Sequence, residues 1–236
     1  MAEPYAVLWD LDGTLIDSEP LHHEAIVELL SREGIEVPDG FQQAVTGLSA
    51  FETWRHCCDQ LEYSGSFEGW VEAKYRYYLS EAPNLIGFEA CMCAYRYYQA
   101  RGVAQAIVSN SDRLIVQANL SAVELQCPEQ VTVTRNDVRH GKPAPEGYRR
   151  AAWLLGVEPS RCVVIEDSAA GARAGVEADM RVIGLIHDVS QPPRFPDVAE
   201  RVAFDTLDGG ALIAQIDTLL EPHDNPEWEH QYDASQ

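Results

Sequence analysis

The stretch YAVLWDLDGTLID, residues 5–17, decides the fold of this chain. It begins with an apolar run that predicts a buried strand, and the run ends abruptly at Asp10, Asp12 and Gly13. Two carboxylates one residue apart at the end of a buried strand are costly to desolvate unless a cation lies between them, and a divalent metal ion is the obvious candidate. These residues alone leave a tight Asp-Gly turn or a helix-capping aspartate open as the alternative.

Composition sets the outer limits on function. The chain has 236 residues, which is enough for one large domain or for one domain with a smaller insertion, and its formal net charge is −21. Such a chain lacks the clustered Lys and Arg that bind phosphate backbones and anionic lipids, so we expect neither nucleic acid nor a membrane as a partner. Neither a signal peptide nor a membrane-spanning run is visible, and a cytoplasmic location is the default expectation.

The hydrophobic pattern predicts a block of helices followed by an alternating α/β chain. Apolar residues recur at helical spacing in three stretches within the block, at 20–30, 49–61 and 67–79. Beyond Pro83, apolar runs alternate with helical patterns, as in a doubly wound sheet, and the expected strands are 104–108, 131–134, 162–165, 181–186 and 202–204. Residues 221–236 are polar, acidic and aperiodic, which predicts a disordered tail.

Polar side chains follow several of the predicted strands, at the sheet edge where open α/β folds bind their ligands. Asp10, Asp12, Ser109, Asn110, Glu166 and Asp167 stand at strand ends, and Lys142 stands in a loop before a helix. Carboxylates in this number suit Mg²⁺ rather than Zn²⁺, and a lysine beside a hydroxyl suits a phosphoryl group. Each residue alone has an ordinary explanation, such as a helix cap for Ser109 or a surface position for Lys142, but their coincidence favours a site.

Four motifs in order resemble those of the haloacid dehalogenase superfamily. They are DLDGT at residues 10–14, SNS at 109–111, GKPAPE at 141–146 and IEDSAAG at 165–171. The resemblance implies an α/β fold, with a doubly wound (Rossmann-like) parallel sheet as its core and a small α-helical cap domain inserted after the first motif. It places the core domain at residues 1–16 and 83–220 and the cap domain at 17–82, with the turn around Asp17 as the hinge.

The resemblance also implies a role for each motif residue. Asp10 would be the nucleophile that becomes an aspartyl phosphate, and Asp12 the general acid and base. Ser109, Asn110 and Lys142 would bind the phosphoryl group. Mg²⁺ would be held by Asp10, Asp12 through its backbone carbonyl, Asp167 and Glu166, the last directly or through water.

Within the superfamily, the chain resembles the branch that contains β-phosphoglucomutase, sugar phosphatases and phosphoglycolate phosphatase. His22 stands where mutases of this branch place a histidine that aligns the acid/base aspartate, although a solvent-exposed position is an equal alternative. Lys74 is a candidate for a cap lysine that contacts the substrate. Ala50 stands where the mutases have an arginine for a second phosphate. The implied function is therefore a Mg²⁺-dependent phosphomonoester hydrolase acting on a small phosphorylated metabolite, with a sugar phosphate favoured.

Two other functions stay open at this point. A phosphosugar mutase is the runner-up, because Arg55 or Arg76 lies near enough in the sequence to replace the missing arginine. A protein that binds a phosphorylated metabolite without turning it over is the further alternative, and the filled catalytic positions disfavour it.

Overall fold

The computed structural model describes residues 5–45, 48–190, 192, 194–197 and 199–220. Its centre is a six-stranded parallel sheet in the order β3-β2-β1-β4-β5-β6. The strands are β1 (Ala6–Trp9), β2 (Ala104–Val108), β3 (Val131–Val133), β4 (Cys162–Glu166), β5 (Arg181–Ile186) and β6 (Glu200–Ala203). The predicted doubly wound parallel sheet is confirmed, with β6 displaced by one or two residues from the predicted 202–204. The tail predicted at residues 221–236 lies outside the described residues.

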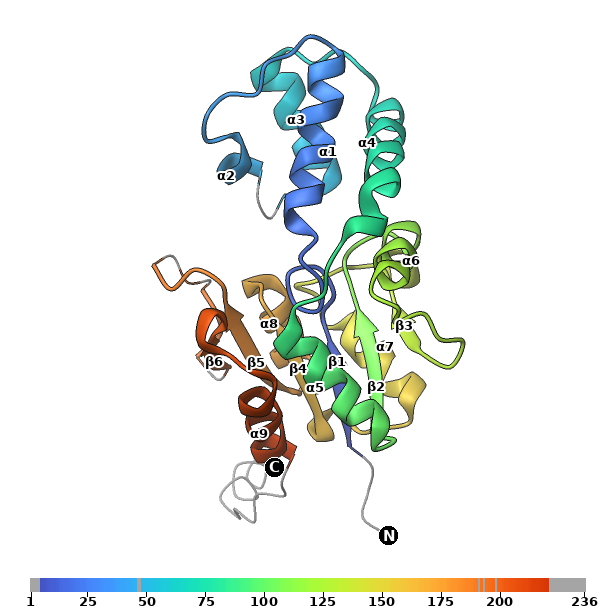
Figure 1. Ribbon diagram of the computed structural model, residues 1–236, viewed down its shortest axis with the longest axis vertical. Helices are drawn as coiled ribbons and strands as arrows, with labels where there is room; N and C mark the ends of the chain where they lie inside the picture. The colour runs from blue at the N-terminus through green and yellow to red at the C-terminus, as the bar shows by residue number, and fades with distance from the viewer. Residues whose placement is uncertain (1–4, 46–47, 191, 193, 198, 221–236) are drawn as a thin grey trace, which may run out of the picture.

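Helices cover both faces of the sheet, which explains why β1 is apolar throughout. Val7 and Trp9 point to the layer that contains α5 (Glu89–Ala100), α6 (Arg113–Ala122) and α9 (Gly209–Leu220). Ala6 and Leu8 point to the other layer, which contains α7 (Glu146–Leu155) and α8 (Ala169–Glu177). The strand that carries the first motif is therefore buried on both sides (Figure 1).

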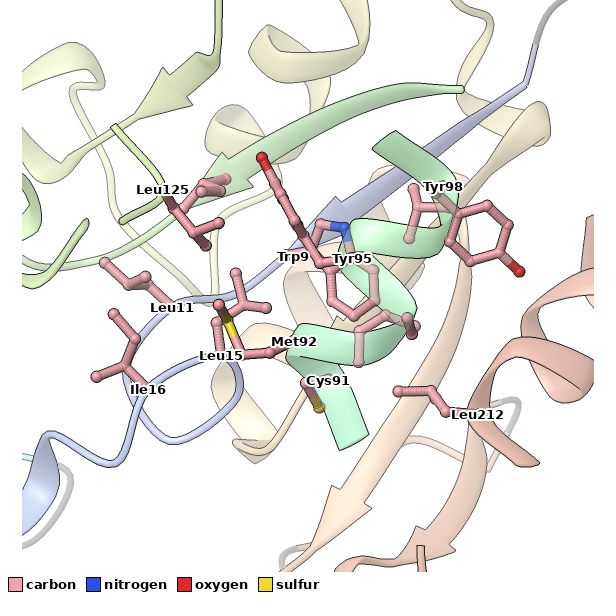
Figure 2. Packing of buried hydrophobic residues seen from close by; sticks show 14 of the residues in the cluster. Trp9, Leu11, Leu15, Ile16, Cys91, Met92, Tyr95, Tyr98, Leu125 and Leu212 are labelled. Carbon is pink, nitrogen blue, oxygen red and sulfur yellow. The ribbon is translucent and has the colours of Figure 1, made fainter. Parts of the chain in front are cut away.

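Trp9 anchors the end of β1 immediately before Asp10. Its ring lies 6.0 Å from the ring of Tyr95 between centroids, and Figure 2 shows the two side chains together over α5. The indole Nε1 donates to Gln105 Oε1 at 2.8 Å, so its one polar group is satisfied although the side chain is fully buried. This packing fixes the backbone from which Asp10 projects.

An inserted block of helices stands beyond the carboxyl edge of the sheet, at the top of Figure 1. We call α1 to α4 the cap helices; their bounds are α1 (Glu19–Arg32), α2 (Phe41–Val45), α3 (Ala50–Leu61) and α4 (Phe67–Glu81), and a 3₁₀ turn, Ala82–Asn84, follows. They bury an apolar cluster of their own around Leu30, Cys57 and Trp70. Three were predicted, whereas α2 was missed because five residues are too few for a periodic signal. No helix in the described residues is long and apolar enough to span a membrane.

Two connecting segments link the cap helices to the sheet, and they run beside each other. Ile16 and Gly87 form an antiparallel bridge, and Asp17 N donates to Ile86 O at 3.1 Å. The turn before them requires glycine at position 13, because φ there is +86° and a Cβ would lie 2.2 Å from Asp167 Oδ2. The first motif thus brings its chain directly against Asp167, which follows β4.

Candidate active site

Three carboxylates from two adjacent strands meet at the carboxyl edge of the sheet. Asp10 follows β1, Glu166 ends β4, and Asp167 is the next residue. Because β1 and β4 pair in parallel, their ends lie side by side, and one oxygen from each of the three acids lies within 4.8 Å of the others. We call these residues the acid cluster.

Lys142 lies within the acid cluster, with only 6% of its side chain exposed. Its Nζ donates to Asp10 Oδ1, to Glu166 Oε1 at 2.6 Å and to Val108 O at 2.8 Å. Asn110 holds the lysine loop in place: its Oδ1 accepts from Lys142 N at 2.8 Å, and its Nδ2 donates to Lys142 O at 3.2 Å. The surface-lysine alternative is therefore wrong, and the predicted contact of Asn110 with phosphate stays a prediction.

Glu166 is fully buried, and its carboxylate is already surrounded by donors. Tyr148 donates its hydroxyl to Oε1 at 3.0 Å, and Ser168 donates its N–H and hydroxyl to Oε2 at 3.0 and 2.9 Å. The carboxylate also fills the space above Gly171, where a Cβ would lie 1.5 Å from Oε1. Glu166 is thus fixed by the protein and in turn fixes Lys142.

The charges of this region do not balance within the protein. When all three acids are ionised, three carboxylates face one ammonium group, and two negative charges are in excess. Burial and then the charge of Glu166 raise the pKa of Asp10 to about 8, although Lys142 opposes the shift. Burial and the charge of Asp10 likewise raise the pKa of Asp167 well above its usual range. Burial alone would lower the pKa of Lys142, but the two carboxylates it contacts raise it above the ordinary value.

A divalent cation fits this imbalance. Carboxylate oxygens are the donors that Mg²⁺ prefers, and an ion of charge +2 would cancel the excess. Asp10 and Asp167 have the better-placed free oxygens, because within the described chain Asp167 accepts one side-chain hydrogen bond, from the Thr14 hydroxyl at 3.3 Å. Glu166 would act directly or through water. The backbone carbonyl of Asp12 as a further ligand stays a prediction.

Asp12 lies in a different environment from Asp10, although the two are one residue apart. Its Oδ1 accepts from Ser18 Oγ at 2.7 Å and from Asn119 Nδ2 at 2.8 Å. Its Oδ2 accepts from Ser111 Oγ at 2.8 Å and from Ser109 Oγ at 3.0 Å. The Asp12 carboxylate is therefore held by four neutral donors, whereas Asp10 is held by the ammonium group of Lys142.

Ser109 and Ser18 each lie beside a helix start without capping it. The capping residue of α6 is Asp112, so the helix-cap alternative for Ser109 is wrong. Ser18 stands at the capping position of α1, yet its hydroxyl makes no bond to that helix and is given to Asp12. Both hydroxyls thus serve the site rather than helix stability. The predicted contact of Ser109 with a phosphoryl oxygen stays a prediction.

A cleft of about 870 Å³ separates the acid cluster from the cap helices. Asp10, Asp12, Ser109, Asn110, Lys142 and Asp167 line it from the sheet side, and His22, His23, Lys74 and Tyr75 line it from the cap side. The structure therefore brings both predicted cap residues, His22 and Lys74, to the same space as the motif residues. A cleft of this size holds a small metabolite with room to spare.

The two cap residues carry perturbed charges. Burial, and then the charge of Lys74, lower the pKa of His22 to about 4, although Asp12 opposes the shift. Its Nε2 lies 3.9 Å from Asp12 Oδ1 and 27% of its side chain is exposed, so His22 is partly buried and faces the cleft, and its role in aligning Asp12 stays a prediction. Burial lowers the pKa of Lys74 to about 8, and its Nζ lies 5.5 Å from the centroid of the Trp70 ring.

The two arginines considered as replacements for the missing mutase arginine lie elsewhere in the described chain. Arg55 and Arg76 are exposed, and neither lines the cleft. Arg76 pairs with Glu72 at 2.7 Å on the outer side of α4. This arrangement offers no second phosphate clamp from either residue.

Among the described residues, five that donate hydrogen bonds to Asp12 or Glu166 were not predicted as site residues: Ser18, Ser111, Asn119, Tyr148 and Ser168. Ser111 and Ser168 stand inside the quoted motifs, so their positions carried a signal. Asn119 and Tyr148 stand at helical core spacing in α6 and α7, where sequence alone indicates only packing.

Fold and site together define the class of this protein: a doubly wound α/β enzyme with an acidic, lysine-containing site at the carboxyl edge of its sheet. A model of the haloacid dehalogenase-like hydrolases matches residues 5–179. The chain belongs to this family, which confirms the predicted superfamily and enzyme class.

Relatives and solved structures agree with this assignment. The chain is 30% identical to a validoxylamine A 7'-phosphate phosphatase of Streptomyces hygroscopicus subsp. limoneus, over 94% of this chain and 96% of that protein. It is also 30% identical to hexitol phosphatase A of Escherichia coli K12, over 81% of this chain and 87% of that protein. A haloacid dehalogenase family hydrolase from Deinococcus radiodurans R1, solved with phosphate and sodium, superposes with a TM-score of 0.69 at 26% identity, over 93% and 97%. A β-phosphoglucomutase from Clostridium difficile superposes with a TM-score of 0.71 at 21% identity, over 92% of this chain and 97% of that chain, and shares the fold.

Proposed function

We propose that the protein is a Mg²⁺-dependent phosphomonoester hydrolase of the cytoplasm that acts on a small phosphorylated metabolite, with a sugar phosphate favoured. One observation carries the proposal: two aspartates one residue apart lie in opposite environments, one beside Lys142 in the acid cluster and one among neutral donors. This is the division expected of a nucleophile and a proton donor. The similarity to phosphatases whose names specify a hexitol phosphate and a 7'-phosphate supports the substrate class.

The reaction proceeds in two displacements. An oxygen of Asp10 attacks phosphorus, the ester P–O bond breaks, and the leaving oxygen takes a proton from Asp12. Asp12, now a carboxylate, then takes a proton from a water molecule that attacks the same phosphorus. The P–O bond to Asp10 breaks, inorganic phosphate leaves, and the Asp10 carboxylate and protonated Asp12 are restored.

Charge compensation comes from the groups around Asp10. Lys142 Nζ lies beside the nucleophile and binds phosphoryl oxygens as they approach, together with Ser109 and Asn110. Mg²⁺, when bound by Asp10, Asp167 and Glu166, neutralises the phosphoryl charge that would otherwise repel the nucleophile.

We assign residues 1–16 and 83–220 to a core domain and residues 17–82 to a cap domain that closes over the substrate. The two connections lie side by side and are bridged at Ile16 and Gly87, so they form one compact hinge near Asp17. Closure would exclude water from the cleft and bring His22 and Lys74 to the leaving group.

The test is a panel of phosphate monoesters, including hexitol and hexose phosphates, assayed for released phosphate with and without Mg²⁺. We expect metal-dependent turnover by the wild type and loss of turnover in Asp10→Asn. Turnover that survives Asp10→Asn would overturn the covalent mechanism, and tight binding without turnover would favour the metabolite-binding alternative. Conversion of a hexose 1-phosphate to the 6-phosphate, stimulated by a bisphosphate, would favour the mutase.

A further inference from the structure

A buried polar pair joins a cap helix to Asp12. Tyr78 of α4 donates its hydroxyl to Asn119 Oδ1 at 2.9 Å, and Asn119 of α6 donates its Nδ2 to Asp12 Oδ1 at 2.8 Å. Both side chains are fully buried. Two hydrogen bonds therefore connect the cap helices with the carboxylate that the proposed mechanism uses as acid and base. We call these two residues the Tyr78–Asn119 pair.

Helix stability does not explain the asparagine. Asn119 lies inside the ten-residue helix α6, between the buried apolar side chains of Val116 and Leu120. Asparagine is a weak helix former, and burying its amide costs free energy that leucine would not incur at this position. The oxygen and the nitrogen of its amide each have a hydrogen-bond partner because one meets Tyr78 and the other meets Asp12.

The tyrosine hydroxyl determines which way the amide points. Because the hydroxyl donates to Oδ1, the Nδ2 group is left facing Asp12, where a donor is needed. The ring of the same tyrosine lies 4.5 Å from the ring of His22, with an angle of 31° between the planes. His22 Nε2 in turn lies 3.9 Å from Asp12 Oδ1. One cap side chain thus supports two neighbours of the same carboxylate oxygen.

The two oxygens of Asp12 have partners from different parts of the molecule. Oδ2 accepts from Ser109 and Ser111, which follow β2 of the sheet. Oδ1 accepts from Ser18, at the hinge, and from Asn119, which Tyr78 orients from α4. The orientation of the carboxylate therefore depends on where α4 lies relative to the sheet.

We propose that Tyr78 and Asn119 are positioning residues that align Asp12 for proton transfer and make its alignment depend on the placement of the cap helices. This inference rests on the proposed function, since it assigns the pair a role in the step that Asp12 performs. Neither residue lines the cleft, so both act through Asp12.

This role can be tested by comparing how each variant changes kcat/KM for two substrates with different leaving groups. An alkoxide leaving group, as in sorbitol 6-phosphate, needs a proton from Asp12, whereas 4-nitrophenolate leaves without one. The ratio kcat/KM covers the steps up to departure of the leaving group, so it reports the acid role separately from the later use of Asp12 as a base. A residue that merely stabilises the fold affects both substrates equally.

Tyr78→Phe removes the hydroxyl and keeps the ring against His22. We expect kcat/KM for sorbitol 6-phosphate to fall about 10-fold, and for 4-nitrophenyl phosphate less than about 2-fold. Asn119→Leu removes the donor to Asp12 itself. It is expected to lower kcat/KM for sorbitol 6-phosphate by about 30 to 100-fold, with a much smaller effect on kcat/KM for 4-nitrophenyl phosphate. Should Asn119→Leu fail to fold, as judged by thermal unfolding, Tyr78→Phe still decides the question.

A matched control and a double variant complete the experiment. Tyr98→Phe removes another buried hydroxyl, which donates to Asp217 at 2.8 Å on the side of α9, and it should leave the ratio between the two substrates unchanged. In Asp12→Asn, adding Tyr78→Phe should cause no further loss, because the pair acts through Asp12.

Equal losses for both substrates in Tyr78→Phe, or a further loss in the double variant, would overturn the inference while leaving the hydrolase intact. Failure of the proposed function gives a different result, since wild type would then release no phosphate from any ester, or Asp10→Asn would retain its activity.

Discussion

Lys74 is expected to destabilise the protein at neutral pH. The side chain lies on the inner side of α4 and lines the cleft beside Asp12 and Asp112. Burial lowers its pKa from an ordinary value of 10.5 to about 8, and the two aspartates only partly oppose that shift. Replacement by methionine keeps the length and apolar stem of the side chain and removes the charge. Lys74→Met should therefore raise the free energy of unfolding and lower the activity.

The size of the effect follows from linkage. A pKa lowered from 10.5 to about 8 corresponds to at most about 3.4 kcal/mol of lost stability at pH 7. Water in the cleft screens the charge, and the variant also loses the contact of the ammonium group with the Trp70 ring, worth about 0.5–1 kcal/mol. A net stabilisation of about 1–2 kcal/mol remains, equivalent to a rise of about 2–8 °C in Tm.

The pH dependence has a definite sign. The folded-state pKa of Lys74 lies below the unfolded one. The stability lost by burying its charge is therefore fully present below pH 8 and is regained as pH rises toward 10.5. The difference between the variant and the wild type should therefore fall to about a quarter of its neutral value by pH 10. Urea denaturation at pH 7 and pH 10 measures both values.

Arg76→Met is the matched control for this experiment. Arg76 lies on the same helix but is exposed and pairs with Glu72 at 2.7 Å, so its removal should change stability by less than about 0.5 kcal/mol at either pH. A Lys74→Met variant that is destabilised at pH 7, or whose stabilisation is the same at pH 10, would refute the reasoning. A stabilised variant with full activity would show that the charge of Lys74 is not needed by the substrate.

Three further outcomes are expected from the acid cluster. Gly171→Ala places a Cβ 1.5 Å from Glu166 Oε1. It should lower the free energy of unfolding, measured by urea denaturation, by about 1–3 kcal/mol and weaken the affinity for Mg²⁺. Unchanged stability would mean that the carboxylate moves freely. Mg²⁺ at 100 times its Kd should stabilise the wild type by about 2.7 kcal/mol in thermal unfolding, and most of that gain should be absent in Asp167→Asn; an equal gain in both proteins would place the ion elsewhere. Tyr148→Phe removes a buried donor to Glu166 and should lower the free energy of unfolding by about 1.5–3 kcal/mol, whereas a neutral result would indicate that Lys142 and Ser168 satisfy the carboxylate by themselves.

The fold and the acid cluster were predictable from the sequence because their signals are local. An apolar run that ends in acids specifies both a buried strand and the edge where it stops, and the parallel pairing of β1 with β4 brings Asp10 to Glu166 and Asp167. Lys142 was also predicted, although a lysine after Gly141 carries no sign of burial by itself. The prediction of Lys142 as a site residue depended on the resemblance of all four motifs to those of the superfamily.

The contacts of the cap helices were much less predictable, because they depend on how separate helices meet. Tyr78 and Asn119 are 41 residues apart and stand at ordinary core positions of α4 and α6. Nothing in either helix indicates that a hydroxyl and an amide will face each other, since periodicity identifies a buried face but not its partner. The short helix α2 was not predicted for a different reason: its five residues span little more than one turn.

The stretch at residues 5–17 places two aspartates one residue apart, and the structure separates them by giving each a different means of holding negative charge. Asp10 depends on charge, from Lys142 and from the cation that the acid cluster fits, so its environment is set by the sheet and is largely independent of the cap helices. Asp12 depends on neutral donors, and two of these, Ser18 and Asn119, belong to the hinge and to the contact with α4. A movement of the cap helices would therefore disturb Asp12 and leave Asp10 in place. Under the proposed mechanism, the nucleophile is always prepared, whereas the proton donor is aligned only when the cap helices occupy the right position over the substrate.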